Sequence, residues 1–200
     1  ELILPNSWTS IGNSFLSGCT SFNSSIFINE DLKEKYPNFE MYIVDSLVAS
    51  SGVALIALKA CRLRDKGMDV SSAHEIILDT AKNEGVYYTT DTLTYFARGG
   101  RLSKTSALIA RALGINIIFA CEPSGKLRVV QKVRGRAKAK RQIIENAKNE
   151  AVNPENNLVY VCHADCYEEA VELGKALVKE VGFSAYFLTD MGPIIGAHTG

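Results

Sequence analysis

Apolar and polar residues alternate with two different periods along the chain, and the changes of period predict helices and strands in turn. The predicted helices cover residues 47–66, 72–84, 92–98, 104–113, 137–151 and 168–181, and the predicted strands cover residues 40–44, 86–90, 115–121, 127–133, 158–162 and 184–189. Alternating strands and helices are typical of an α/β protein. We therefore predict an α/β fold with a mixed sheet flanked by helices.

Turn and capping residues separate these elements. Asp45-Ser46 precede the first helix, and Ser71 or Ser72 is expected to cap the second. Glu122-Pro-Ser-Gly125 is a turn sequence, so the two strands beside it are expected to pair as an antiparallel hairpin. The first 28 residues show no clear strand, and residues 196–200 are expected to form a glycine-rich turn with no element after it.

Charge is balanced over the whole chain but not locally. The 200 residues carry 22 basic and 22 acidic side chains, yet eight Lys or Arg and no acid lie between Glu122 and Glu145. That segment has no aromatic residue on which bases would stack, so nucleic acid is not the expected partner. A basic face that meets an acidic protein partner or solvent is the interpretation favoured.

The sequence shows neither a membrane-spanning segment nor a signal-peptide pattern. Its most apolar run, residues 107–120, is interrupted by Arg111 and Gly114. The five cysteines are an odd number without disulfide spacing, which favours reduced thiols in a cytoplasmic protein. Cys162 and Cys166 lack a second ligand pair, so we expect neither a metal site nor a cofactor.

Three glycine-containing corners carry the candidate chemistry. They are Arg98-Gly-Gly-Arg101, Arg134-Gly-Arg136 and Gly196-Ala-His-Thr-Gly200. Glycine lets a ligand or a partner approach the backbone closely. Two cationic corners and one imidazole indicate an anionic ligand or partner rather than a metal centre.

These corners and their neighbours resemble the motifs of the DegV family in the same order. The matching segments are Leu16-Ser-Gly18 with Phe22-Asn-Ser24, Tyr42-Ile-Val-Asp-Ser46 with Ala49-Ser50, Asp91-Thr-Leu-Thr-Tyr95, Arg98-Gly-Gly-Arg-Leu-Ser-Lys104, Lys132-Val-Arg-Gly-Arg136 and Gly196-Ala-His-Thr-Gly200. The resemblance covers roughly residues 16–200.

The resemblance implies a DegV-like fold of two α/β domains. The opening strand and aspartate-serine turn of the family are missing from this chain, so its N-terminal domain is expected to be incomplete. On this basis residues 1–39 are expected to be a remnant of that domain, and residues 40–200 the C-terminal domain.

The family also implies a ligand, a long-chain fatty acid held between the two domains. Ser17, Thr20 or Ser21, His198 and Thr199 are the implied ligands of its carboxyl group, because hydroxyls and an imidazole N–H can satisfy a buried carboxylate. Thr9 or Ser10 is a further candidate, in a segment similar to the family's proline-threonine-serine motif.

The implied partner is an ATP-using fatty acid kinase subunit, to which the family docks through arginines. Arg101 and Arg134 are the corresponding residues here, and a guanidinium fork suits a partner's carboxylate or phosphate. The chain itself has no phosphate-loop pattern, so it is expected to be a non-catalytic lipid-binding subunit.

Two alternatives remain open from the sequence. His198 is also a candidate nucleophile for a small carbonyl substrate, as in the related substrate-binding part of dihydroxyacetone kinases. A fragment whose binding site is incomplete is the other alternative. His74, within a predicted helix, and His163, at a strand end, are interpreted as structural or solvated.

Overall fold

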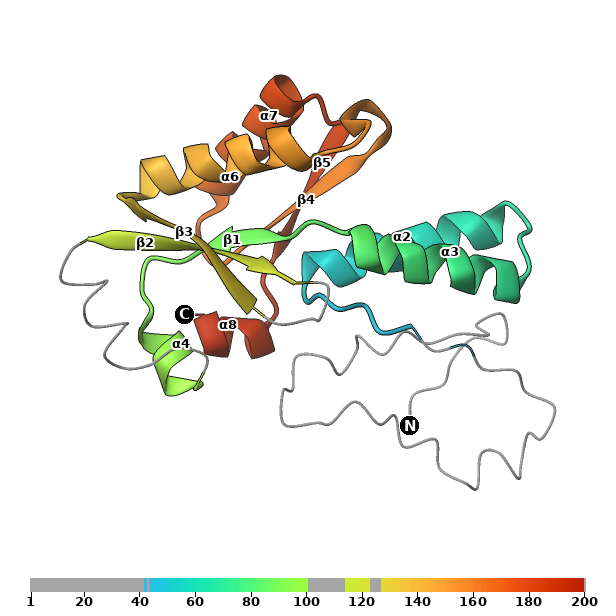
Figure 1. Cartoon of the computed structure of the whole chain (residues 1–200), viewed down its shortest axis with the longest axis horizontal. Coiled ribbons are helices and arrows are strands. Elements are labelled where there is room, and N and C mark those ends of the chain that lie inside the picture. Colours follow the sequence, from blue (N-terminus) through green and yellow to red (C-terminus); the bar gives the residue numbers. More distant parts are fainter. Residues whose placement is uncertain (1–41, 43, 101–113, 123–126, 200) are drawn as a thin grey trace. The chain divides into compact units, whose positions relative to one another are not determined.

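The computed structural model describes residue 42 and residues 44–100, 114–122 and 127–199 (Figure 1). It divides into two compact units, Glu1–Glu84 and Gly85–Gly200. The expected boundary between residues 39 and 40 and the predicted helix 104–113 fall outside the described residues, so both stay predictions.

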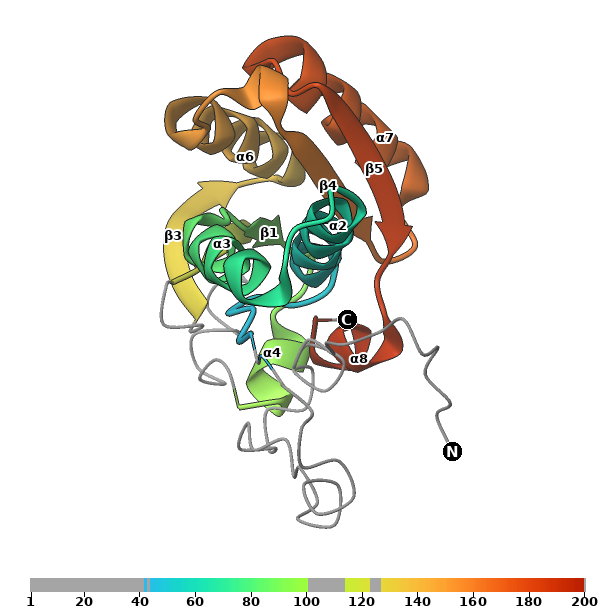
Figure 2. The ribbon, with the colours of Figure 1, turned by 90° about the vertical axis from the view of Figure 1, so that its right-hand side faces the viewer.

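The described part of the first unit is a pair of helices, α2 (Ser51–Asp65) and α3 (Val70–Asn83). They pack side by side (Figure 2). Ile56 and Leu63 of α2 and Ile77 and Ala81 of α3 are buried. Both helices were expected from the apolar spacing, and their existence is confirmed.

The predicted starts of these two helices are wrong. The first begins at Ser51 because Leu47 and Ser50 have φ of 58° and 50°, outside the helical region. The second is capped by Asp69, whose Oδ1 accepts a hydrogen bond from the Ser72 amide at 2.9 Å. Tyr42, within the predicted strand 40–44, is not in a strand.

The second unit contains two sheets and the helices that cover them. Its elements in order are β1 (Tyr87–Thr89), α4 (Thr94–Arg98), β2 (Ile115–Cys121), β3 (Leu127–Arg134), α6 (Arg136–Glu150), the 3₁₀ turn η2 (Pro154–Asn156), β4 (Leu158–His163), α7 (Tyr167–Ala176), its π-helical continuation η3 (Leu177–Val181), β5 (Ala185–Asp190) and α8 (Pro193–Thr199). The α/β class is confirmed.

The strands pair as one antiparallel and one parallel sheet. In the first, β1-β2-β3 are antiparallel, with an irregularity in register between Ile118 and Phe119. The predicted hairpin is thereby confirmed. In the second, β4 and β5 are parallel, and His163 pairs with Asp190 at their carboxyl ends. Within the described residues, the two pairing types expected of a mixed sheet thus belong to separate sheets.

Helices α4 and α6 cover opposite faces of the antiparallel sheet. Phe119 packs with Phe96 of α4, whereas its neighbour Ile118 packs with Ala139 and Ile143 of α6. Successive residues of a strand point to opposite faces, which explains this division. Helices α6 and α7 also pack together with β4 around Ile144, so α6 joins both sheets of the unit (Figure 1).

The end of the chain differs from its prediction. Residues Pro193–Thr199 form helix α8 and not a glycine-rich turn. Pro193 is the first residue of this helix, where its fixed φ suits helical geometry and its missing N–H is not needed. Gly196 is tolerated within the helix, and its amide donates to the Gly192 carbonyl at 3.0 Å.

Candidate functional site

Helix α8 brings His198 against the glycine turn that follows α4. Helices α4 and α8 lie side by side (Figure 2). A β-carbon built on Gly99 would be 2.9 Å from His198 Nδ1. The next residue, Gly100, has a φ of 74°. The fold therefore unites two of the three corners singled out in the sequence, although His198 was expected in a turn and lies in a helix.

His198 has an available imidazole. The side chain is only half-buried, and neither of its ring nitrogens has a hydrogen-bond partner among the residues that the structure describes. An imidazole presents one donor and one acceptor when neutral and two donors when protonated. It is thus free to donate a hydrogen bond to an anionic group that enters the corner.

The hydroxyl group of Thr199, the neighbouring candidate, already forms a hydrogen bond within its own helix. Its Oγ1 donates to the Ile195 carbonyl at 3.0 Å and also lies 3.2 Å from Met191 Sδ. Its backbone carbonyl oxygen accepts from Thr90 Oγ1 at 3.2 Å. The residue therefore anchors the end of α8 to the segment after β1.

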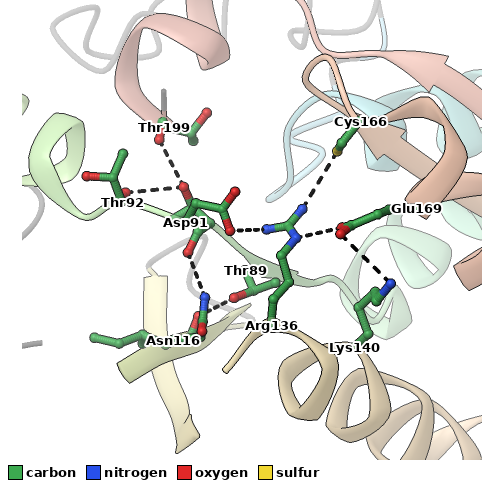
Figure 3. Close-up of polar contacts among 11 residues, drawn as sticks. Thr89, Asp91, Thr92, Asn116, Arg136, Lys140, Cys166, Glu169 and Thr199 are labelled. Atoms are coloured by element: carbon green, nitrogen blue, oxygen red, sulfur yellow. Dashed lines mark hydrogen bonds and ion pairs between the residues drawn. The ribbon is translucent and has the colours of Figure 1, made fainter. Parts of the chain in front are cut away.

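Residues 89–92, at the end of β1 and directly after it, form a threonine-rich corner; Asp91 and Thr92 belong to one of the quoted family motifs, but no role in the site was expected for this segment. Thr90 Oγ1 lies 3.2 Å from the carbonyl oxygens of both Thr92 and Thr199, so one hydroxyl proton is shared between them. The Thr90 carbonyl in turn accepts from Asn116 Nδ2 at 3.4 Å (Figure 3). The run Thr89-Thr-Asp-Thr92, which begins at the last residue of a strand, is the signal that identifies the segment in the sequence.

Arg136, at the start of α6, reaches the same corner through Asp91. Its Nη1 donates to Asp91 Oδ1 at 2.6 Å, its Nε donates to Glu169 Oε2 at 2.6 Å, and its Nη2 contacts Cys166 Sγ at 3.7 Å (Figure 3). Burial lowers the pKa of Arg136, but the hydrogen bond to Glu169 and the charges of Asp91 and Glu169 outweigh it and raise this pKa. The guanidinium is therefore a fixed cation.

Other cations of the basic segment are also paired within the protein. Lys140 Nζ lies 3.1 Å from Glu172 Oε2, and Arg141 pairs with Glu145 and Glu180. Most of the charge of α6 is thus matched by carboxylates of α7 and η3. The basic face expected from the sequence is therefore largely neutralised along α6.

Strand β3 carries three exposed cations. Arg128, Lys132 and Arg134 are exposed and form no ion pair with the residues that the structure describes. Arg134 directly precedes Gly135, whose φ is 88°, and Arg136. The two arginines of this corner therefore differ: Arg134 projects to solvent, whereas Arg136 is held internally.

Several of the predicted site residues belong to the N-terminal segment and to the segment after α4. The hydroxyls of Ser17, Thr20 and Ser21, those of Thr9 and Ser10, and the guanidinium of Arg101 all lie outside the described residues. Their roles stay predictions.

The two other histidines lie in other elements than His198. His163 is 8% exposed at the end of β4, with Nδ1 3.6 Å from Asp190 Oδ1 and the ring edge-on to Tyr167. His74 lies in α3, with its ring 5.2 Å from that of Tyr42. Both positions suit the structural role proposed from the sequence.

The described ranges hold neither a cluster of metal ligands nor a membrane-spanning helix. No group of at least three His, Cys, Asp or Glu side chains there is arranged to hold a metal ion. Nor does any helix in these ranges combine the length and apolar character needed to cross a membrane.

Comparison with known proteins gives a consistent family match. The model of the family described as uncharacterised protein, DegV family, matches residues 14–200. A DegV domain-containing protein of Clostridium perfringens is 30% identical over 188 residues, which are 94% of this chain and 64% of that protein. The chain therefore spans slightly less than two thirds of this relative.

Solved structures show the same fold. A DegV family protein from Ruminococcus gnavus, refined with vaccenic acid, has a TM-score of 0.81 and 25% identity over 90% of this chain and 64% of its own. The Streptococcus pneumoniae Fatty Acid Kinase (Fak) B3 protein, loaded with linoleic acid, has a TM-score of 0.79 and 18% identity, with coverage of 90% and 63%. At that identity the second likeness concerns the fold alone.

Proposed function

This chain belongs to the DegV family, and on that premise we propose that it binds a long-chain fatty acid and presents the carboxyl group to an ATP-using kinase subunit. The carboxyl group would lie at the corner formed by α8 and the turn after α4. The observation that carries this proposal is the half-buried imidazole of His198, which faces Gly99 and has both nitrogens available within the described part of the chain.

The chemistry of a carboxylate suits such a corner. A buried carboxylate that lacks hydrogen bonds costs several kcal/mol, and donors remove this penalty. His198 supplies one donor without a permanent opposing charge. Ser17 and either Thr20 or Ser21 would supply hydroxyl donors. The Thr199 hydroxyl, which donates to the Ile195 carbonyl, would supply a further donor when its O–H bond rotates toward the carboxylate.

The acyl chain needs an apolar environment, and one lies next to the corner. Helix α4 carries Phe96, which stacks on Phe119 and Tyr88 at centroid separations of 5.0 and 6.1 Å. This aromatic layer supports the glycine turn from the side of the sheet. We propose that the acyl tunnel begins beside this layer and continues along apolar surface.

The partner would approach the exposed cations. Arg134 has no ion pair with the described residues and lies at the end of β3, close in sequence to the internally held Arg136. An unpaired guanidinium is ready to form charge-assisted, bidentate bonds with a carboxylate or phosphate. We propose that Arg134, together with Arg101, docks the kinase subunit, which supplies ATP and performs the phosphoryl transfer.

Organic extraction of the purified protein, followed by mass spectrometry of the extract, tests this proposal. We expect a near-stoichiometric long-chain fatty acid. An extract without fatty acid from correctly folded protein would contradict the lipid-binding function. Intact-mass analysis under denaturing conditions completes the test, because a covalent adduct would instead point to a carbonyl substrate bonded to His198.

A further inference from the structure

We propose that Arg136 is a positioning residue for the His198 corner: it fixes the Thr90–Asp91 segment, which in turn holds the end of α8. This inference rests on the proposed function, because it explains how the carboxylate-binding imidazole is kept in place. It assigns a role to the internal arginine of the Arg134-Gly-Arg136 corner, separate from the exposed Arg134.

The guanidinium of Arg136 joins three separate segments. One arm contacts Asp91, after β1, and the other two contact Glu169 in the first turn of α7 and Cys166 at its N-cap. The partners are 45, 33 and 30 residues away in sequence. A guanidinium whose three nitrogen atoms each form a contact is held in a more defined orientation than an ammonium group with a single contact.

The position of this cation is unfavourable for its own helix. Arg136 is the first residue of α6, and the first turn of that helix contains no acidic residue. The positive end of the helix dipole disfavours a cation there. The contacts with Asp91 and Glu169 therefore compensate an intrinsic cost, which is consistent with a residue that serves its neighbours and not the helix.

Among the described residues, the Arg136–Asp91 ion pair is the one that links α6 to the ligand corner. Within the described chain, Lys140 and Arg141 bind carboxylates of α6, α7 and η3, whereas Arg136 also binds Asp91 in the β1–α4 segment. Arg136 thus connects the α6–α7 layer to the segment that contacts α8 (Figure 3).

Thr90 connects the segment that Arg136 holds to α8, the helix that contains His198. It directly precedes Asp91, and its hydroxyl donates to the carbonyl of Thr199, the residue after His198. Helix α8 has only seven residues and buries none of them fully. So short a helix depends on tertiary contacts for its stability, so a shift of Thr90 is expected to shift His198.

Arg136→Gln and Arg141→Gln form a matched pair that tests the inference. Both changes remove a basic residue of α6 that contacts two carboxylates, but only Arg136 is linked to Thr90 through Asp91. After delipidation, we expect Arg136→Gln to bind oleic acid about fivefold more weakly than the wild type, and Arg141→Gln to bind it with unchanged affinity.

Conservative variants separate positioning from a loss of folding. Asp91→Asn should weaken oleic acid binding like Arg136→Gln, and the double variant should be no worse than Arg136→Gln alone. Arg136→Lys, which keeps the charge but not the fork, should fall between wild type and Arg136→Gln. The hydrogen-exchange rate of the α8 amides is a second measurement. We expect this rate to be faster in Arg136→Gln and unchanged in Arg141→Gln.

The outcomes are distinguishable. Equal losses of affinity in Arg136→Gln and Arg141→Gln, or unchanged exchange in α8, would overturn the positioning role while the lipid-binding function stands. A wild-type protein that does not bind oleic acid would overturn the proposed function. In that case, faster α8 exchange confined to Arg136→Gln would still support the structural part of the inference.

Discussion

The imidazole of His198 lies so close to Gly99 that a β-carbon on Gly99 would stand 2.9 Å from Nδ1. The same β-carbon would be 3.3 Å from the Tyr95 carbonyl oxygen, so it has little room to move away. Gly99 has φ of −77° and ψ of 0°, which other residues also adopt. The glycine is therefore required by the space that His198 occupies and not by backbone conformation.

Gly99→Ala should displace His198 while the protein stays folded. We expect about a tenfold loss of affinity for oleic acid, because a hydrogen bond to a charged group is lost or lengthened. The measurement is titration of delipidated protein, with thermal unfolding in parallel. Gly192→Ala is the control, since nothing lies within 4 Å of a β-carbon at that position. An unchanged affinity in Gly99→Ala would contradict the placement of His198.

Arg134→Ala should impair docking without releasing the ligand. The side chain is exposed and has no ion pair with the described residues, so its removal should leave the fold and the fatty acid content unchanged. We expect affinity for the kinase subunit to fall about tenfold or more, with a weaker dependence on salt.

Arg128→Ala is the control for this docking experiment. Arg128 pairs with Ala120 and Arg134 pairs with Ile115, so the two arginines lie on opposite faces of the sheet. Calorimetry with the purified kinase subunit at two ionic strengths measures both variants. Equal effects of the two changes would show that the partner senses net charge and not the Arg134 corner.

Glu84 should make stability fall as pH rises. Burial raises the pKa of its carboxyl group to about 8, and neither oxygen has a hydrogen-bond partner among the described residues. The folded protein then keeps this proton up to about pH 8, whereas the unfolded chain loses it near the ordinary pKa of 4.5. Stability is therefore highest below that ordinary value, falls through the interval, and levels off above pH 8.

Glu84→Gln should remove this part of the pH dependence. We expect the variant to be more stable than the wild type at pH 8.5 by up to a few kcal/mol, as about 1.4 kcal/mol accompanies each unit of pKa shift. Urea unfolding at pH 5 and 8.5 measures the effect. Glu75→Gln, at an exposed position in α3, the helix that ends just before Glu84, should retain the wild-type pH profile. Parallel profiles for Glu84→Gln and wild type would refute the prediction.

Gly174→Ala should destabilise the packing of α7 against the parallel β4–β5 sheet. A β-carbon on Gly174 would be 2.3 Å from the ring of Tyr186, so α7 would have to move away from β5. We expect a loss of about 1–3 kcal/mol in the free energy of unfolding, measured in urea. Combining the change with Tyr186→Leu should restore part of the loss. No loss, or no relief in the double variant, would argue against this close packing.

Local patterns in the sequence were enough to predict most of the elements of the second unit. The turn around Pro123 and the alternation on either side predict the β2–β3 hairpin, and the long basic segment predicts α6. Helix α8 was missed because seven residues that include a glycine carry little periodic signal. Its stability comes from contacts with α4 and Thr90, which no local pattern encodes.

The site was predictable only in part. Gly99 and His198 stand out because glycine and histidine are informative residue types, and the structure brings them together. The pairing of Arg136 with Asp91 and Glu169 was not predicted, because partners 45 and 33 residues away have no fixed spacing. The basic segment was interpreted without the acidic helix that follows it, so its neutralisation along α6 was not foreseen.

Binding of oleic acid to delipidated wild type, His198→Ala and His74→Ala tests the central claim most directly. His74, in a helix of the other unit, controls for the loss of an imidazole. We predict that His198→Ala binds oleic acid about tenfold to a hundredfold more weakly than wild type and that His74→Ala binds it equally well. Wild-type affinity in His198→Ala would contradict the claim that this imidazole binds the carboxyl group.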